Sequence, residues 1–252
     1  MASQGKVAFI TGANKGIGLE TARGLGQLGI AVIIGSRDEA NGRAAADKLR
    51  DEGIEGVEAV RFDVTSPADH AAIARHIQER RGKLDILVNN AGVMLDEVEM
   101  AGQGGFNSTS SVTPDALRKT FETNFFAVVA LTQTLLPLIR KSPAGRIVNL
   151  SSILGSLTLH SDPNSPIYTM KGFAYDASKT ALNAFTVHLA HELKGTPIKV
   201  NSAHPGWVKT DMGGSAAPME VSEGGKTSVL LATLPDDGPT GGFSHLREPL
   251  PW

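Results

Sequence analysis

Cysteine is absent from the 252-residue chain, and this absence excludes several classes of chemistry. Without thiols there is no disulfide framework, no cysteine-ligated zinc, no iron–sulfur cluster and no thiol nucleophile. An excess of charge is also missing, because 24 Lys and Arg residues balance 26 Asp and Glu residues and leave a net charge of −2. That balance gives no electrostatic reason to bind nucleic acid or an anionic membrane. We therefore expect neither as a partner.

Long hydrophobic runs are scarce as well. A membrane-spanning helix needs about 18 or more consecutive apolar residues. The most apolar segment, Ala127 to Ile139, is interrupted by polar residues and by Pro137. The start of the chain, MASQGKVAFITG, lacks the basic region, apolar stretch and cleavage site of a signal peptide. We expect a soluble cytoplasmic protein, and because α/β domains often reach about 250 residues, we expect residues 1–252 to form one domain.

Short β-branched segments alternate with longer segments of helical periodicity. Strands are predicted at Lys6–Ile10, Ala31–Gly35, Val57–Asp63, Leu84–Asn89, Arg146–Leu150 and Ile198–Ala203. Helices are predicted at Ile17–Leu28, Glu39–Glu52, Pro67–Arg81, Pro114–Lys141 and Ala174–Leu193. Runs such as Val32–Ile34 do not alternate with polar residues, which is typical of parallel strands covered on both faces. The pattern predicts an α/β fold of the Rossmann type, with a doubly wound parallel sheet of about seven strands.

Three further segments have weaker patterns. Asp96–Ser111 and Gly155–Gly172 are irregular, and both follow strands on the carboxyl side of the sheet, where α/β folds bind ligands. We expect them near the site, with mobile surface loops as the alternative. The tail Thr233–Trp252 is rich in proline and is expected to cover the edge of the core.

A glycine-rich motif, Thr11–Gly18 with the sequence TGANKGIG, lies between the first strand and the first helix. Gly12, Gly16 and Gly18 allow a tight turn and a close approach of the backbone to a pyrophosphate at the helix N-terminus. The spacing differs from the common GxGxxG, and no Lys-Ser/Thr pair of a P-loop follows. The motif favours dinucleotide binding over an ordinary strand-to-helix turn.

Tyr175 and Lys179 lie four residues apart in a predicted helix and therefore share one face. A nearby ammonium is expected to lower the pKa of a phenol from its usual ~10, which makes tyrosine a usable proton donor and acceptor. The alternative is a coincidence on a solvated face. The other tyrosine, Tyr168, precedes Lys171 by three residues in a segment without helical pattern.

Four motifs occur in order: the glycine-rich turn, Asn89-Asn90-Ala91-Gly92, a serine after the fifth strand, and the Tyr-x-x-x-Lys pair. In this combination the chain resembles the short-chain dehydrogenase/reductase family over essentially its whole length. It is most similar to the NADPH-dependent carbonyl reductases, through Asn14-Lys15 and the segment Gly35–Asp38. The resemblance implies that NADPH or NADP⁺ is the cofactor.

The resemblance also implies roles for the catalytic side chains. Tyr175 would protonate the carbonyl oxygen, Lys179 would lower its pKa and bind the nicotinamide ribose, and Ser152, rather than Ser151, would polarise the carbonyl. Asn124 would complete a proton relay to the lysine. These implied roles divide the chain into an N-terminal half that holds the cofactor and a C-terminal half that carries catalysis and substrate binding.

The cofactor contacts implied by the resemblance are spread over several strand ends. The implied set is Gly12, Asn14, Lys15, Gly16, Ile17, Gly18, Ser36, Arg37, Asp63, Val64, Asn90, Ala91, Gly92, Tyr175, Lys179, Pro205, Gly206, Val208 and Thr210. Asp38 lies at the count where an NAD site often has a carboxylate. Ser36 ends the second strand, however, and the Arg37 guanidinium can bind a 2′-phosphate. We therefore expect NADP(H), and we interpret Asp38 as the start of a helix.

The substrate is expected to be a bulky hydrophobic ketone or aldehyde, because ketone pockets are mostly apolar. Twenty-two residues separate Ser152 from Tyr175, and this segment is expected to form one wall with Ile153, Leu154 and Leu157. Trp207 and Met212 are expected to form a second wall. The alternative is that the segment between Ser152 and Tyr175 forms a surface loop or a subunit contact that does not reach the pocket. The family associates through the helices expected at 114–141 and 174–193, but some members are monomers, so the oligomeric state stays open.

The seven histidines do not form a recognisable metal site, and no metal is expected. His204, beside Pro205, is expected in the pocket wall. A serine hydrolase is excluded by the lack of a GxSxG elbow. Two other functions remain as alternatives: a regulatory protein that binds a nucleotide without turnover, and an NAD-dependent alcohol dehydrogenase.

Overall fold

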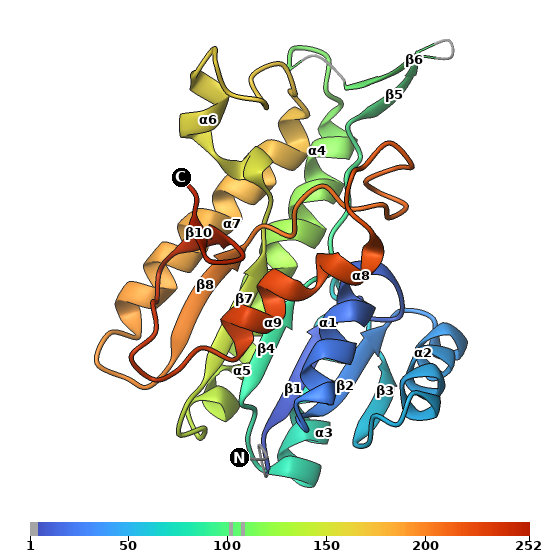
Figure 1. The fold of residues 1–252 in the computed structure, drawn as a ribbon, viewed down its shortest axis with the longest axis vertical. Coiled ribbons are helices and arrows are strands. Elements are labelled where there is room, and N and C mark those ends of the chain that lie inside the picture. The colour runs from blue at the N-terminus through green and yellow to red at the C-terminus, as the bar shows by residue number, and fades with distance from the viewer. Residues whose placement is uncertain (1–4, 101–102, 107–108) are drawn as a thin grey trace.

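The computed structural model describes residues 5–100, 103–106 and 109–252. Its centre is a sheet of eight short strands. In chain order these are β1 (Val7–Thr11), β2 (Ala31–Ser36), β3 (Val57–Arg61), β4 (Ile86–Asn89), β7 (Arg146–Leu150), β8 (Lys199–Ala203), β9 (Phe243–His245) and β10 (Glu248–Pro249). Their order across the sheet is β10-β9-β8-β7-β4-β1-β2-β3 (Figure 1). Every pairing is parallel except that of β10 with β9. The predicted doubly wound parallel sheet is confirmed.

Helices cover both faces of this sheet, as Figure 1 shows. The longer ones are α1 (Gly16–Gln27), α2 (Glu39–Asp51), α3 (Pro67–Arg81), α4 (Pro114–Phe121), α5 (Ala127–Ile139) and α7 (Phe173–Glu192). The shorter ones are α6 (Leu157–Ser161), α8 (Val221–Gly224), α9 (Lys226–Ala232) and a single 3₁₀ turn, η2 (Ile153–Gly155). Ser66 and Thr113 cap α3 and α4 through bonds from the N–H groups of Asp69 (3.2 Å) and Ala116 (3.1 Å), as expected for residues that precede Pro67 and Pro114.

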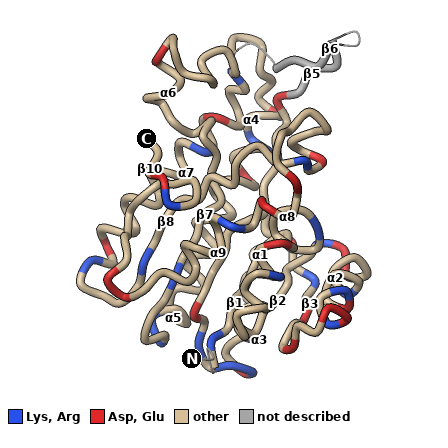
Figure 2. Tube along the Cα trace, in the orientation of Figure 1, with Lys and Arg blue, Asp and Glu red and all other residues tan. Residues whose placement is uncertain are grey.

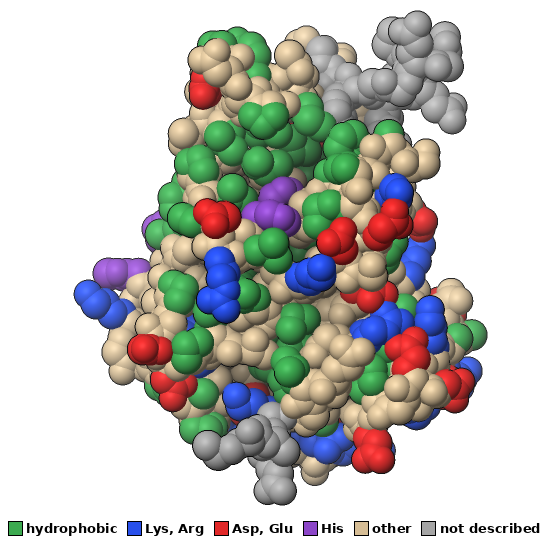
Figure 3. All heavy atoms as spheres, in the orientation of Figure 1, with side chains coloured by type: hydrophobic (Ala, Val, Ile, Leu, Met, Phe, Trp, Pro, Cys, Tyr) green, Lys and Arg blue, Asp and Glu red, His purple; other side chains and the backbone are tan. Residues whose placement is uncertain are grey.

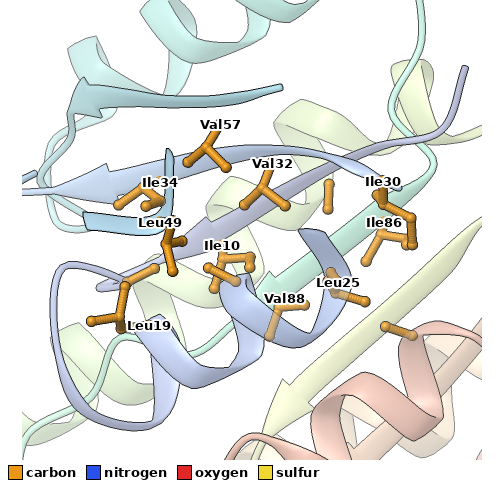
Figure 4. Close-up of a cluster of buried hydrophobic side chains, with 14 of the residues drawn as sticks. Ile10, Leu19, Leu25, Ile30, Val32, Ile34, Leu49, Val57, Ile86 and Val88 are labelled. Carbon is orange, nitrogen blue, oxygen red and sulfur yellow. The ribbon is translucent and has the colours of Figure 1, made fainter. Parts of the chain in front are cut away.

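Neighbouring residues of the apolar strands point into two different cores. Val32 and Ile34 belong to the cluster under α1, α2 and α9, whereas Ile33 belongs to the cluster under α3, α5 and α7. Figure 4 shows the first cluster, in which Leu25 from α1 and Leu49 from α2 reach the side chains of the sheet. Each buried aliphatic side chain contributes about 1.5–3 kcal/mol relative to its exposed state. Burial on both faces explains why these strands carry no polar alternation.

Three segments differ from the sequence expectation, and the tail, which was expected to cover the edge of the core, contains strands that were not predicted. The helix expected at 114–141 is interrupted by a π-helical turn, η1 (Glu122–Phe126). The segments expected to be irregular contain α6 and a two-stranded hairpin of β5 (Glu97–Met100) and β6 (Gln103–Phe106). The tail adds β9 and β10 to the sheet edge, where Phe243 stacks on Trp252 with ring centres 5.6 Å apart. Such short strands have no sequence period long enough to read.

One segment of the described chain, Pro114–Ile139, is long and apolar enough to cross a membrane by length and composition alone. In the structure it lies over the sheet, where Leu131 and Leu135 are fully buried. Charged residues of both signs are interspersed over the outer helices in Figure 2.

Candidate active site

Loops that follow the carboxyl ends of β1, β2, β3, β4, β7 and β8 surround a cavity of about 1590 Å³. On the face shown in Figure 3, hydrophobic side chains gather between α6 and the loop before α8, with histidine side chains below them. This edge is where open α/β sheets bind ligands. All expected site residues line the cavity except Ser36, Asn124 and Leu157.

Tyr175 and Lys179 lie in the first turns of α7, and both side chains are buried in the cavity wall. The Lys179 Nζ is 5.5 Å from the centre of the Tyr175 ring and donates a hydrogen bond of 2.7 Å to the Leu150 carbonyl oxygen. Burial lowers the pKa of Lys179 to about 8. The helical spacing therefore placed the two side chains together, as expected.

The pKa of the Tyr175 phenol differs from the sequence expectation. Burial raises it to about 12, because the charged phenolate is poorly solvated there, and a hydrogen bond with Ser152 opposes this shift. The expected lowering by Lys179 was wrong for this state of the protein. The four-residue spacing predicts that the Lys179 ammonium lies close to Tyr175, but it gives no information on how deeply the phenol is buried. At neutral pH the phenol keeps its proton and can donate it.

The contacts of the two serines after β7 show which of them faces Tyr175. Ser152 bonds to the Tyr175 phenol, and its Oγ also accepts the Leu154 N–H at 3.2 Å. The Ser151 hydroxyl is buried and has no hydrogen-bond partner among the described residues. Ser152 is thus the member of the pair that contacts the tyrosine.

Asn124 lies in the π-helical turn, fully buried behind the cavity. Its Oδ1 accepts the Val93 N–H at 2.8 Å, and its Nδ2 donates to the Val93 carbonyl (2.8 Å) and to Ser178 Oγ (3.0 Å). A side chain added at Gly92 would meet Asn124 Oδ1 at 3.3 Å and Lys179 Nζ at 3.5 Å. Asn124 therefore holds the segment after β4 against α7, with Gly92 between it and the lysine.

Asp96 is a site residue that the sequence analysis missed. It is fully buried, and its two carboxylate oxygens accept the backbone N–H groups of Ala174 (2.7 Å) and Tyr175 (2.8 Å). A carboxylate from a distant loop thus caps the helix that carries the tyrosine, where the helix dipole favours negative charge. The burial of Asp176 and the charge of Asp96 together raise the pKa of Asp176 to about 8. His160 Nε2 lies 3.3 Å from the Asp176 carboxylate. Only the fold brings Asp96 to α7, so no local pattern could reveal it.

The glycine-rich turn has the properties of a phosphate cradle. Gly12 and Gly16 adopt positive φ values of 63° and 57°, and a Cβ at Gly18 would lie 2.5 Å from the Asn90 amide nitrogen. Lys15 is the N-cap of α1 and makes no side-chain cap bond within the described chain. Asn90 donates to the carbonyl oxygens of Thr11 (2.8 Å) and Gly12 (3.0 Å) and so fixes the turn. The residues present fit a dinucleotide whose pyrophosphate lies at the start of α1.

Of the three residues expected to select NADP(H), two line the cavity and one does not. Arg37 and Lys15 line the cavity, and Lys15 Nζ contacts the Asp211 carboxylate at 2.5 Å. Ser36 is buried, and its hydroxyl donates to the Asp38 carbonyl oxygen at 2.7 Å. Ser36 thus supports the turn at the end of β2, and its expected contact with the cofactor stays a prediction. Asp38 caps α2 by accepting the Asn41 N–H at 2.8 Å, as expected.

Asp63 and Val64 line the cavity beyond Arg37, at the end of β3. Hydrogen bonds from the backbone and hydroxyl of Thr65 hold the pKa of Asp63 below its usual value, and the charges of Arg37 and Arg61 add to the effect. Asp63 is thus a charged acceptor at the outer part of the cavity.

Apolar side chains dominate the other end of the cavity, around Tyr175. Leu154, Ile167 and Tyr175 form a buried cluster, against which Ile153 and Met170 pack. The long segment between Ser152 and Tyr175 therefore lines the cavity instead of forming a remote loop.

Two other side chains of this segment lie elsewhere. Leu157 is 62% exposed and does not line the cavity, so its expected place in the wall was wrong. Tyr168 is exposed with the Lys171 Nζ above its ring, and it also lies outside the wall.

The second wall comes from the loop after β8. Trp207 and Met212 line the cavity with Pro205, Gly206, Val208 and Thr210, as expected. The Trp207 indole N–H donates to the Gly213 carbonyl oxygen at 2.8 Å, which holds the loop in shape. Sequence reasoning missed Val93, Met94 and Leu95, which follow the Asn-Asn-Ala-Gly motif into the same cavity. These three apolar residues directly follow a motif at the end of a strand, and this position in the sequence could have identified them.

His204 occupies the cavity wall beside Ser152. Its Nδ1 accepts the Ile153 N–H at 3.2 Å, and burial, with a smaller effect from His245, lowers its pKa to about 3. Within the described residues, no group of three or more His, Cys, Asp or Glu side chains could hold a metal ion.

Comparison with known proteins gives consistent matches over the whole chain. The family model described as short chain dehydrogenase matches residues 6–221. Short-chain dehydrogenase/reductase 1 of Saponaria officinalis is 33% identical over 99% of this chain and 97% of its own length. Carbonyl reductase [NADPH] 1 of Mus musculus is 32% identical over 100% of both chains.

Comparison with solved structures gives the same family. The NADPH-bound carbonyl reductase from chicken fatty liver superposes with a TM-score of 0.82 at 28% identity, covering 98% of this chain and 99% of that one. Salutaridine reductase from Papaver somniferum gives a TM-score of 0.79 at 31% identity over 94% of this chain and 99% of that chain. The family-model match and these relatives together show that the chain belongs to the short-chain dehydrogenase/reductase family and resembles its carbonyl reductases.

Proposed function

We propose that this chain is a cytoplasmic, NADPH-dependent reductase that converts hydrophobic ketones or aldehydes to alcohols, in a reversible reaction. The observation that carries the proposal is the meeting of Tyr175, Ser152 and Lys179 in one wall of a cavity whose far end contains the glycine turn and Arg37. A cavity used only for nucleotide binding has no need of a buried tyrosine–lysine pair.

The proton chemistry follows from the environment of the phenol. NADPH, when bound, supplies the hydride that the carbonyl carbon receives. Tyr175 donates its proton to the carbonyl oxygen, and a pKa of about 12 keeps that proton in place at neutral pH until the oxygen becomes basic. Ser152 donates a hydrogen bond to the same oxygen and stabilises its growing negative charge. The Lys179 ammonium, 5.5 Å from the ring centre, stabilises the phenolate that remains.

In this proposal the N-terminal half of the chain holds most of the cofactor, and the C-terminal half contacts only its nicotinamide end. The turn of Gly12, Gly16 and Gly18 receives the pyrophosphate. The adenosine end lies against Asp63, Val64 and Asn90, and Arg37 binds the 2′-phosphate with help from Lys15. The nicotinamide end lies against Lys179 and the segment Pro205–Thr210. NADPH appears in the names of the mouse relative and of the chicken structure, which supports this choice over NADH.

Catalysis and substrate binding belong to the C-terminal half. Ile153, Leu154, Trp207 and Met212 give the substrate end an apolar surface, which favours bulky hydrophobic carbonyl compounds over sugars or charged acids. We further propose that Asn124 acts by positioning, because its hydrogen bonds connect the segment after β4 to α7 beside Lys179.

The test is a paired measurement of binding and turnover. Titration with NADPH and with NADH gives the affinity for each cofactor, and loss of NADPH absorbance with a panel of hydrophobic ketones gives turnover. The proposal predicts tighter binding of NADPH together with formation of the alcohol. Binding without turnover of any ketone or aldehyde would instead support a regulatory nucleotide-binding protein. Turnover with equal kcat/KM for both cofactors would support an alcohol dehydrogenase without NADP preference.

A further inference from the structure

His204 presents a hydrogen-bond donor at the substrate end of the cavity. Its Nδ1 accepts the backbone N–H of Ile153, so that nitrogen carries no proton. The hydrogen of the neutral ring is therefore on Nε2, on the other side of the ring. Among the described residues no hydrogen bond to Nε2 occurs, and Nε2 is not one of the fully enclosed side-chain atoms without a partner. Because His204 lines the cavity, its N–H is available to a bound molecule.

The ring is held rigidly and close to the reacting groups. The His204 backbone N–H bonds to the Ser244 carbonyl oxygen at 2.8 Å, and its own carbonyl oxygen accepts the His245 Nδ1–H at 3.0 Å. The His245 ring also packs against it, with ring centres 5.3 Å apart. Ile153, which contacts Nδ1, directly follows Ser152, the residue bonded to Tyr175. His204 and Ser152 therefore lie close together in the wall of one cavity, which a substrate with its carbonyl at Ser152 and Tyr175 would share.

We propose that His204 is a specificity-determining residue whose Nε2–H binds an oxygen acceptor on the carbon next to the reacting carbonyl. The inference rests on the proposed reductase function and narrows its substrate class to vicinal dicarbonyl compounds and related ketones with an adjacent oxygen. Leu154, Ile167 and Met212 line the same cavity and give its wall an apolar surface. A donor beside these apolar side chains discriminates between ketones with and without an oxygen on the adjacent carbon, because a substrate without that acceptor leaves the N–H unpaired. The lowered pKa keeps the ring neutral, so the donor persists across the working pH range.

The test compares benzil with deoxybenzoin, which differ by one oxygen beside the reacting carbonyl. The measured quantity is the ratio of their kcat/KM values with NADPH, and comparing that ratio between variants cancels the intrinsic reactivity of each ketone. In H204N the amide oxygen can still accept the Ile153 N–H, but the donor at Nε2 is lost. We expect the ratio to fall by about tenfold, which corresponds to 1.4 kcal/mol. In H204Q, whose longer amide extends a donor into the cavity, most of the ratio should return.

Two controls make the outcome decisive. H191N makes the same change at an exposed histidine of α7 and should leave the ratio as it is in the wild type. In the wild-type protein, where folding is not in question, hydrobenzoin should inhibit more strongly than diphenylethanol, because only the diol carries the second oxygen. An unchanged ratio in H204N, or equal inhibition by the two alcohols, would overturn the role of His204. If the wild type reduces other hydrophobic ketones but not benzil, the inference fails and the proposed function stands; if it reduces no ketone or aldehyde, the proposed function fails as well.

Discussion

Replacing Asp96 by asparagine tests whether the carboxylate at the start of α7 holds Tyr175 in place. Asp96 accepts two backbone N–H groups, at 2.7 and 2.8 Å, and an amide has one acceptor oxygen for them. The second N–H then faces an NH₂ donor, and a buried donor without an acceptor costs about 1–3 kcal/mol. Losing the negative charge at a helix N-terminus adds up to about 2 kcal/mol. Relief of the repulsion between Asp96 and Asp176 offsets part of this loss. We expect the free energy of unfolding to fall by about 2–4 kcal/mol.

The assay is thermal unfolding together with steady-state kinetics. For a chain of this size 1 kcal/mol corresponds to about 2–4 °C, so the Tm of D96N should fall by about 5–15 °C. Because a displacement of about 1 Å can cost 10²-fold in rate, kcat should fall by about 10- to 100-fold while the KM for NADPH changes little.

D38N is the matched control for this change. Asp38 is exposed and accepts one N–H, from Asn41, and asparagine caps helices as well as aspartate does. Its Tm should stay within about 2 °C of the wild type. If D96N has the Tm of D38N and the kcat of the wild type, the positioning role of Asp96 is refuted.

Three other predictions concern the cofactor, the pH and the substrate wall. Arg37→Ala should raise the KM for NADPH by at least about tenfold and leave that for NADH nearly unchanged, because only the 2′-phosphate loses a partner; equal changes in steady-state assays would refute the assignment. Since burial lowers the pKa of Lys179 to about 8, its ammonium is lost as the pH rises through that value, and kcat/KM for reduction should fall roughly tenfold per pH unit above it; a level profile up to pH ~10 would contradict this. Leu154→Ala and Met212→Ala should reorder kcat/KM values across ketones of different size by about 10-fold or more, with an unchanged KM for NADPH; identical rankings would place the substrate elsewhere.

The sequence predicted the sheet well because strands such as β1, β2 and β4 are short apolar runs. Residues 32–34 alternate between two cores, so their hydrophobicity marks them as buried on both faces. Pro67 and Pro114 marked helix starts through steric preferences that act within a few residues. The strands at the far edge, β9 and β10, escaped prediction because two or three residues carry no readable period. The π-helical turn at Asn124 is likewise set by tertiary hydrogen bonds to Val93 and Ser178.

The site was predictable where its motifs are local and was missed where it depends on the fold. Tyr175 and Lys179 are joined by helical spacing, which the sequence contains. Asp96 reaches Tyr175 across 79 positions, and only the assembled structure makes that contact. The pKa of Tyr175 shows the same limit, because its rise to about 12 comes from burial among residues of several elements.

The most direct test of the account is the kinetics of Tyr175→Phe beside Tyr168→Phe. The first variant loses the phenolic proton in the cavity, and the second loses the same hydroxyl from an exposed ring outside it. With a hydrophobic ketone and NADPH, we predict that Y175F loses at least ~10²-fold in kcat while its Kd for NADPH is unchanged, and that Y168F keeps wild-type turnover. Wild-type turnover by Y175F, or its loss in Y168F, would contradict the assignment of Tyr175 as the proton donor.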